Sequence, residues 1–229
     1  MKTADKLDLS VIDIRGFKET PYAGHPASFS ATIPEILIKK HTVEGDIVFD
    51  PFNGSGTTAI KACTMDRRGI GTDVNPRFLE MSQNRWKEIN KQLLVPYQYS
   101  PQFILDDART LEQIPDDSVD FVVSSPPYQD TVTYSKTTER IARDLGNLSR
   151  ERYLEGMERV IESTGRKLKK GKSCYWLMYD ITVDGIFYPV GADITEICFK
   201  SKTLKLEKVH LILLMALSYY SYAIRCTKR

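Results

Sequence analysis

The sequence predicts an α/β fold, a doubly wound and mostly parallel sheet with helices on both faces. Short apolar segments, typical of buried parallel strands, alternate with segments in which apolar residues recur every three or four positions. Most of the short apolar segments end in an acid or a proline. The 229 residues suffice for one domain with a substantial core and leave little room for two.

The first half of the chain predicts four strands and three helices. Glycines and prolines break any periodicity near the start, and Asn75-Pro76 suits the N-cap and first turn of a helix. The pair Pro126-Pro127 ends the fourth strand. In chain order we expect an irregular lead-in over residues 1–28, a helix from residue 30, a strand at 46–50, a helix at 57–66, a strand at 69–73, a helix at 76–94, and strands at 103–105 and 119–123.

The second half predicts a long helix and further strands. A helical pattern resumes after Tyr134, pauses at Gly146-Asn147, and runs from Arg150 until Gly171 ends it. A fifth strand follows at 174–179. One or two more strands are expected after residue 200, although residues 204–217 fit a strand or a helix equally well. Such alternation favours a parallel sheet, which binds ligands beyond the carboxyl ends of its strands.

Composition is typical of a soluble globular protein, with 41% hydrophobic and 27% charged residues. The start of the chain is polar, and the longest apolar run, Leu211–Leu217, is far too short to cross a bilayer. We therefore expect a cytoplasmic protein with no membrane partner. The four cysteines form no CxxC pair and the three histidines form no cluster, which predicts free thiols and no metal site.

Charge is distributed unevenly along the chain, although the net charge is only +2. Residues 1–129 hold 14 Lys and Arg against 18 Asp and Glu, whereas residues 130–229 hold 18 against 12. The basic second half suits contact with phosphates, and a solvated surface explains it equally well.

A glycine-rich turn joins the first predicted strand to the helix after it. In Asp50-Pro51-Phe52-Asn53-Gly54-Ser55-Gly56-Thr57-Thr58 the chain turns tightly and presents a helix N-terminus to a ligand. Asp73 ends the next strand, 19 residues after Gly54, where an acid can accept hydrogen bonds from a ribose diol. The two features fit an adenosine-containing cofactor. Ala59 stands where a nicotinamide dinucleotide motif requires its third glycine, which disfavours that cofactor.

The nine-residue string resembles the cofactor motif of the DNA amino-methyltransferases, in which Asp-Pro-Phe-x-Gly-Ser-Gly-Thr-Thr is typical. The resemblance implies a Rossmann-like methyltransferase fold and S-adenosyl-L-methionine as the cofactor. His25-Pro26-Ala27 with Pro34-Glu35 is similar to the family segment that packs over the methionine end of the cofactor. Asp107-Ala108 is similar to the site of the adenine contact, and the adjacent Asp106 is an equally placed alternative. The cofactor residues implied are His25, Pro26, Ala27, Asp50, Pro51, Phe52, Asn53, Gly54, Ser55, Gly56, Thr57, Thr58, Asp73, Val74, Asn75, Asp107 and Ala108.

Ser125-Pro126-Pro127-Tyr128 follows the fourth strand and predicts the catalytic site. Two prolines hold the backbone in a rigid, extended path, which suits a site that fixes a small polar group. Hydrogen bonds from an exocyclic amino group to the Ser125 hydroxyl and a proline carbonyl would expose the nitrogen lone pair for in-line attack on the methyl group. No metal is needed.

The same tetrapeptide resembles that of the DNA amino-methyltransferases. In the family, Ser at its first position is more frequent among cytosine-N4 enzymes, and Asp or Asn among adenine-N6 enzymes. The resemblance thus favours cytosine N4 and implies duplex DNA as the partner. A base inside a duplex must be flipped out to react, and Tyr128 offers a face on which it can stack.

The resemblance covers about residues 20–200 and has two departures. Only 101 residues follow Tyr128, so we expect a single methyltransferase domain over residues 1–229, without a separate target-recognition domain. Sequence recognition then falls to loops, to a separate specificity subunit, or is loose. The run Leu211–Leu217 does not resemble the family and predicts an altered C-terminus with an open sheet edge. Two alternatives stay open: an RNA guanine-N2 methyltransferase, and a non-catalytic cofactor-binding subunit.

Overall fold

The computed structural model describes residues 10–13, 30–91, 93–127, 144–183, 185–213 and 221–229. The strands are β1 (Ser10–Asp13), β2 (Ile47–Asp50), β3 (Arg68–Asp73), β4 (Gln102–Leu105), β5 (Val119–Ser124), β6 (Leu168–Tyr179), β7 (Ile181–Val183), β8 (Ile186–Tyr188), β9 (Leu204–Leu213) and β10 (Ser221–Lys228). The helices are α1 (Thr32–His41), α2 (Thr57–Cys63), α3 (Pro76–Lys91), α5 (Arg150–Lys167) and α6 (Val190–Lys200), with a 3-10 turn η1 (Leu145–Asn147).

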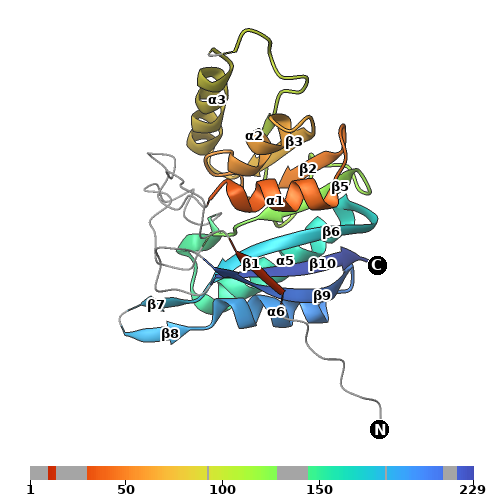
Figure 1. Ribbon diagram of the computed structural model, residues 1–229. Helices are drawn as coiled ribbons and strands as arrows, with labels where there is room; N and C mark the ends of the chain where they lie inside the picture. Colours follow the sequence, from red (N-terminus) through yellow and green to blue (C-terminus); the bar gives the residue numbers. More distant parts are fainter. Residues whose placement is uncertain (1–9, 14–29, 92, 128–143, 184, 214–220) are drawn as a thin grey trace.

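One sheet organises the molecule, in the strand order β1-β9-β10-β6-β5-β2-β3-β4 (Figure 1). Every described neighbour pair in it is parallel except the two pairs that β10 makes, with β6 and with β9. The predicted doubly wound, mostly parallel sheet is therefore confirmed. From β2 the chain proceeds outward to β3 and β4 and then returns to β5 on the other side of β2. This reversal places a crevice at the carboxyl ends of β2 and β5.

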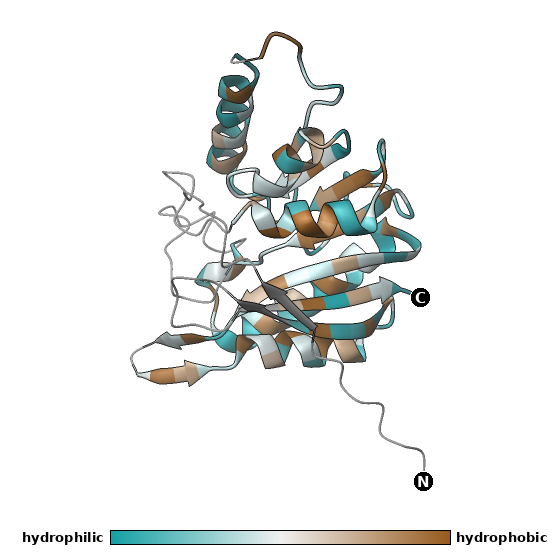
Figure 2. Ribbon diagram, viewed as in Figure 1, coloured by the Kyte–Doolittle hydropathy of each residue, from teal (hydrophilic) through white to brown (hydrophobic). Residues whose placement is uncertain are grey.

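Helices cover the two faces of the sheet, and the strand sequences explain how. Because successive side chains of a strand point to opposite faces, Val48 and Phe121 pack with α1. Their chain neighbours Phe49 and Val122 pack in the larger core under α5 and α6. Helix α3 buries only one narrow face, and Figure 2 accordingly shows it as largely hydrophilic along its length.

Two predicted boundaries are wrong for physical reasons. Residues 10–13, assigned to an irregular lead-in, form β1, which pairs in parallel with β9. This long-range pairing leaves no local signal. The long helix ends at Lys167 rather than near Gly171, since Leu168 already pairs with Val119 of β5. Gly171, with φ +74°, instead lies within β6, where its register against β5 shifts.

The C-terminal region does not leave its last strand at an open edge, contrary to expectation. The ambiguous stretch from residue 204 forms β9, and β10 lies between β6 and β9. The hairpin of β7 and β8 and the helix α6 were not predicted. Cys63, Cys174, Cys198 and Cys226 are buried free thiols, as expected.

Two kinds of feature are absent from the described residues. No helix among them is both long and apolar enough to cross a membrane. Across the same ranges, no group of three His, Cys, Asp or Glu side chains is arranged to hold a metal ion.

Candidate cofactor and catalytic site

The described cofactor residues lie at three neighbouring strand ends, with Asp50–Thr58 after β2, Asp73–Asn75 after β3, and Asp107–Ala108 after β4. Parallel strands bring these carboxyl ends to one edge of the sheet. The fourth predicted element, Ser125-Pro126-Pro127, follows β5 at the same edge, on the other side of β2. The fold thus assembles the two motifs of the sequence into one site.

The loop between β2 and α2 is held in one conformation by α3. Asn53 Nδ2 donates to Ser82 Oγ at 2.8 Å and to the Gly54 carbonyl at 3.1 Å. Arg85 Nη1 donates to the Ser55 carbonyl at 3.1 Å. The loop is therefore preorganised, which lowers the entropic cost of binding a ligand.

Gly56 shows why this turn requires glycine. Its φ of +78° lies in the left-handed region. A Cβ added there would lie 3.0 Å from both Cβ and Oγ of Ser82 and 3.2 Å from Ile60 Cδ1. Helix α2 begins at the next residue, Thr57, so the tight turn brings the unpaired N–H groups of its first turn to the edge of the site.

Asp73 joins the loop to the end of β3. Its Oδ2 accepts from the Gly54 N–H at 3.0 Å, and its Oδ1 accepts from the Asn75 N–H at 2.8 Å. Asn75 Oδ1 in turn accepts from the Arg77 N–H at 3.1 Å and caps α3, as predicted. A carboxylate oxygen accepts more than one hydrogen bond, so Asp73 retains capacity for two ribose hydroxyls.

Acids at this site favour a positively charged ligand. Burial, with a small contribution from the nearby Asp73, raises the pKa of Asp50 to about 7. Burial raises the pKa of Asp73 to about 6, with Asp144 adding to the effect, and burial also raises the pKa of Asp144 itself. A cation between these carboxylates would relieve their repulsion. S-adenosylmethionine fits, since its ammonium and sulfonium groups are both positive.

A hydrogen bond connects the cofactor strand to the catalytic strand. Ser124, the last residue of β5, donates from Oγ to Oδ1 of Asp50, which is 1% exposed. Next to it, Ser125 is half-buried, Pro126 is buried and Pro127 is half-buried. The start of the tetrapeptide is thus positioned by the residue that also orients Asp50.

The two acids after β4 have different partners. Asp106 stabilises its own loop, since its Oδ2 accepts from the Gln113 N–H at 3.0 Å. Asp107 forms an ion pair with Arg109, with Oδ2 2.6 Å from Nη2. Ala108 is buried, and its carbonyl accepts from Ser163 Oγ of α5 at 2.7 Å. The adenine contact at Asp107 stays a prediction.

Four predicted site residues, His25, Pro26, Ala27 and Tyr128, lie outside the described residues, so their roles also stay predictions. Pro34 and Glu35, predicted to belong with His25-Pro26-Ala27, are described. Pro34 is buried in α1. Glu35 forms an ion pair with Lys61 of α2 at 2.8 Å.

Sequence reasoning missed three residues of the site. Ser82 and Arg85 hold the cofactor loop, and only their spacing of three along α3 hinted at a shared face. Asp144, 7% exposed, follows a polar stretch in which no pattern separates it from surface acids.

Comparison with known proteins agrees with this geometry. A family model described as DNA methylase, N6_N4_Mtase, matches residues 8–84. The orphan methyltransferase M.BamHII of Bacillus amyloliquefaciens is 44% identical over 63 residues, which are 28% of this chain and 24% of that protein. Residues 8–84 are thus similar to the DNA methylases that this family model describes. The type II methyltransferase M2.MboI of Moraxella bovis is 36% identical over 78 residues, 34% of this chain and 29% of that protein.

The family model covers the predicted cofactor residues from Asp50 to Asn75, which supports S-adenosylmethionine as the cofactor. The part aligned with each of the two curated relatives is less than a third of that relative's length. A crystal structure of TrmN from Thermus thermophilus superposes on 89% of this chain and 50% of its own with a TM-score of 0.63. At 15% identity that likeness shows the methyltransferase fold alone.

Proposed function

We propose that the chain transfers a methyl group from S-adenosylmethionine to an exocyclic amino group of a base in duplex DNA, with cytosine N4 favoured over adenine N6. The observation that carries the proposal is the adjacency of β2 and β5, closed by the hydrogen bond between Ser124 and Asp50. It supports the proposal because Ser125, the predicted catalytic residue, follows Ser124 directly in the chain.

The residues divide the binding of the cofactor among them. Asp73 accepts from the ribose hydroxyls, the glycine turn admits the cofactor close to the backbone, and Asp50 faces its positive end. His25, Pro26 and Ala27 cover the methionine end, and Asp107 contacts the adenine amino group. When bound, the cofactor supplies an electrophilic methyl group.

The tetrapeptide positions the nucleophile. An amino group conjugated with a base ring is a weak nucleophile, because its lone pair is shared with the ring. Ser125 Oγ and the Pro126 carbonyl accept its two hydrogens, which turns the lone pair toward the methyl group. Formation of the new carbon–nitrogen bond would break the carbon–sulfur bond of the cofactor and release S-adenosylhomocysteine, and the nitrogen would pass one proton to water. Tyr128 stacks on the flipped base.

Cytosine N4 is favoured because Ser125 stands first in the tetrapeptide. We propose that loops or a separate specificity subunit select the target sequence.

Transfer of tritium from labelled S-adenosylmethionine tests the proposal, with duplex DNA and transfer RNA as parallel substrates. We expect label in DNA and none in RNA. Label confined to RNA would replace the proposed substrate. Calorimetric binding of the cofactor without label in either would make the chain a non-catalytic cofactor-binding subunit.

A further inference from the structure

The hairpin of β7 and β8 leaves the sheet beside the catalytic strand. In the parallel pair β5–β6, Ser124 lies opposite Trp176, and β6 continues for three residues to Tyr179. Residues 125–127 and the start of the hairpin therefore emerge at the same level of the same edge. Figure 1 shows the hairpin projecting from the body of the molecule, clear of the sheet.

The base of the hairpin is firmly anchored. Ile181 is 6% exposed and belongs to the larger core. Tyr188 packs against that core, with the guanidinium of Arg150 5.5 Å from its ring centroid. Arg150 also forms an ion pair with Asp193 of α6 at 2.7 Å. These contacts fix the direction in which the hairpin projects.

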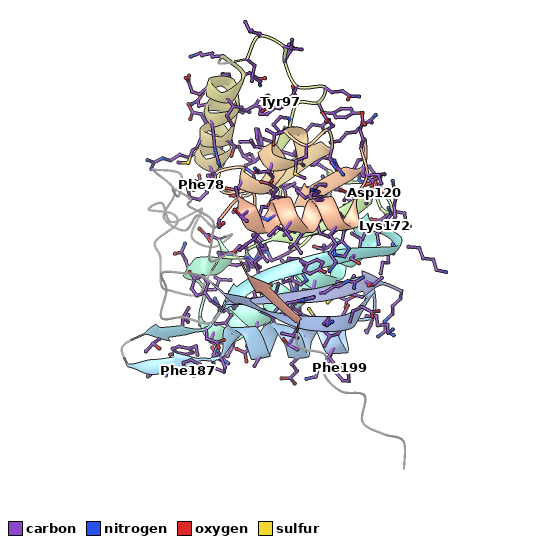
Figure 3. The ribbon with its side chains drawn as sticks, in the orientation of Figure 1. Phe78, Tyr97, Asp120, Lys172, Phe187 and Phe199 are labelled. Carbon is purple, nitrogen blue, oxygen red and sulfur yellow. The ribbon has the colours of Figure 1, made fainter. Side chains whose placement is uncertain are left out.

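Its tip, in contrast, presents apolar side chains to solvent. Ile186, which pairs with Val183 at the turn, is 57% exposed, and Phe187, the next residue of β8, is 61% exposed on the opposite face of the hairpin. Gly185 in that turn has φ +80° and open space around it. Figure 2 shows hydrophobic residues on β8, and Figure 3 shows Phe187 out on the hairpin. An anchored ribbon with an exposed apolar tip is shaped to insert into another molecule.

We propose that the hairpin is an apolar wedge, with Ile186 on one face and Phe187 on the other. The wedge enters the base stack of duplex DNA and fills the space left by the flipped target base. The inference rests on the proposed function. Extrusion of a base leaves a gap in the stack, and apolar side chains inserted between base steps are a common means of holding DNA in an altered geometry. The wedge lies at the edge of the sheet to which the base must come.

The size of the tip favours DNA over a second copy of the chain. Each hairpin strand has three residues, and two large apolar side chains are exposed in its described part. A stable protein interface buries roughly 800 Å² on each partner, far more than two side chains supply. A gap the size of one base needs no more than that.

The test compares binding of two labelled DNA duplexes by fluorescence anisotropy, one intact and one with a single abasic site. An abasic site is a preformed gap, so the wild-type chain should bind that duplex about tenfold more tightly. Ile186→Ser with Phe187→Ser should abolish this preference. Phe199→Ser is the matched control, because Phe199 is 73% exposed in the last turn of α6, away from the hairpin (Figure 3), and this variant should keep the preference.

The outcomes separate the wedge from the proposed function. The wedge is overturned if the double variant keeps the preference for the abasic duplex. It is also overturned if sedimentation shows a dimer for the wild type and a monomer for the double variant. Both results hold even where the wild type methylates DNA. Equal binding of both duplexes by the wild type also overturns it. Tritium transfer to DNA, measured on the same preparation, reports on the proposed function independently. Binding of S-adenosylhomocysteine by calorimetry shows that the double variant is folded.

Discussion

At the residue scale, the side chains of Asp73 and Ser125 have different proposed ligands. Asp73 is fixed by two backbone N–H groups, and in the proposed reaction it accepts hydrogen bonds from the cofactor. Ser125 follows the residue whose hydroxyl donates to Asp50, and in the same proposal it binds the amino group of the base. Because the two act on different ligands, their substitution should have separable effects.

Asp73→Asn should weaken cofactor binding about tenfold to a hundredfold, since a hydrogen bond to a charged group contributes about 1.5–3 kcal/mol. Wild-type affinity should also rise as pH increases through about 6, because the ionised carboxylate is the form that binds. The variant should lose this component. Calorimetry with S-adenosylhomocysteine between pH 5 and 7.5, a range set by the shifted pKa, measures both effects.

Asp116→Asn is the control for that comparison, because this acid forms an ion pair with Lys167 at the opposite edge of the sheet. Equal affinity of Asp73→Asn and the wild type would remove Asp73 from the cofactor site.

Gly56→Ala should lower the free energy of unfolding by about 1–3 kcal/mol. Gly171→Ala is the matched control, since Gly171 has φ +74° but no atom within 4 Å of an added Cβ. Both substitutions strain the backbone, so the excess cost at Gly56 measures its contact with Ser82. Urea unfolding gives both values, and equal losses would mean that this contact is unimportant.

At the element scale, sequence patterns predict correctly those strands and helix ends that are determined by residues close together in the chain. The strands β2 to β5 and the cap of α3 by Asn75 follow from short apolar runs and from side-chain capping within a few residues. The strand β1 and the order of β9 and β10 depend on pairing across the whole chain, which no window of sequence contains. Asp50 and Asp73 were placed correctly because the motif itself fixes their strand ends, whereas Asp144 has no motif.

Helix α6 shows what the missed elements contribute. Ile194 is fully buried in the larger core, so Ile194→Ala should cost about 2–5 kcal/mol of the free energy of unfolding. Phe199→Ala, in the same helix but exposed, should change it by less than about 0.5 kcal/mol. Urea denaturation compares the two. Similar values would show that α6 does not pack on the sheet as described.

At the scale of the whole molecule, the cofactor site reduces stability. Asp50 and Asp73 have folded pKa values of about 7 and about 6, both above the ordinary value of 3.8. Between those limits these two acids bind more protons in the folded state than in the unfolded state, so their contribution to stability falls as pH rises. His41, whose pKa burial lowers to about 4, contributes with the opposite sign over part of this range. The protein thus carries destabilised acids at the proposed cofactor site, a common cost of function.

The contribution of Asp50 to the free energy of unfolding should therefore decline by roughly 2–4 kcal/mol between about pH 4 and pH 7, and the difference between the wild type and Asp50→Asn isolates it. Asp50→Asn should make the decline smaller, since its amide does not ionise. Urea unfolding across this pH range tests the sign. A wild-type chain that gains stability over the same range, in parallel with the variant, would contradict the pKa of Asp50.

In the proposed reaction, one site brings the cofactor next to the amino group of a base. The nucleosides of treated DNA test this proposal most directly. Duplex DNA is incubated with the chain and S-adenosylmethionine, digested, and analysed by mass spectrometry. We expect N4-methylcytosine, absent with Ser125→Ala although that variant still binds the cofactor. N6-methyladenine would keep the site and change the base. DNA with neither modified nucleoside would contradict the claim.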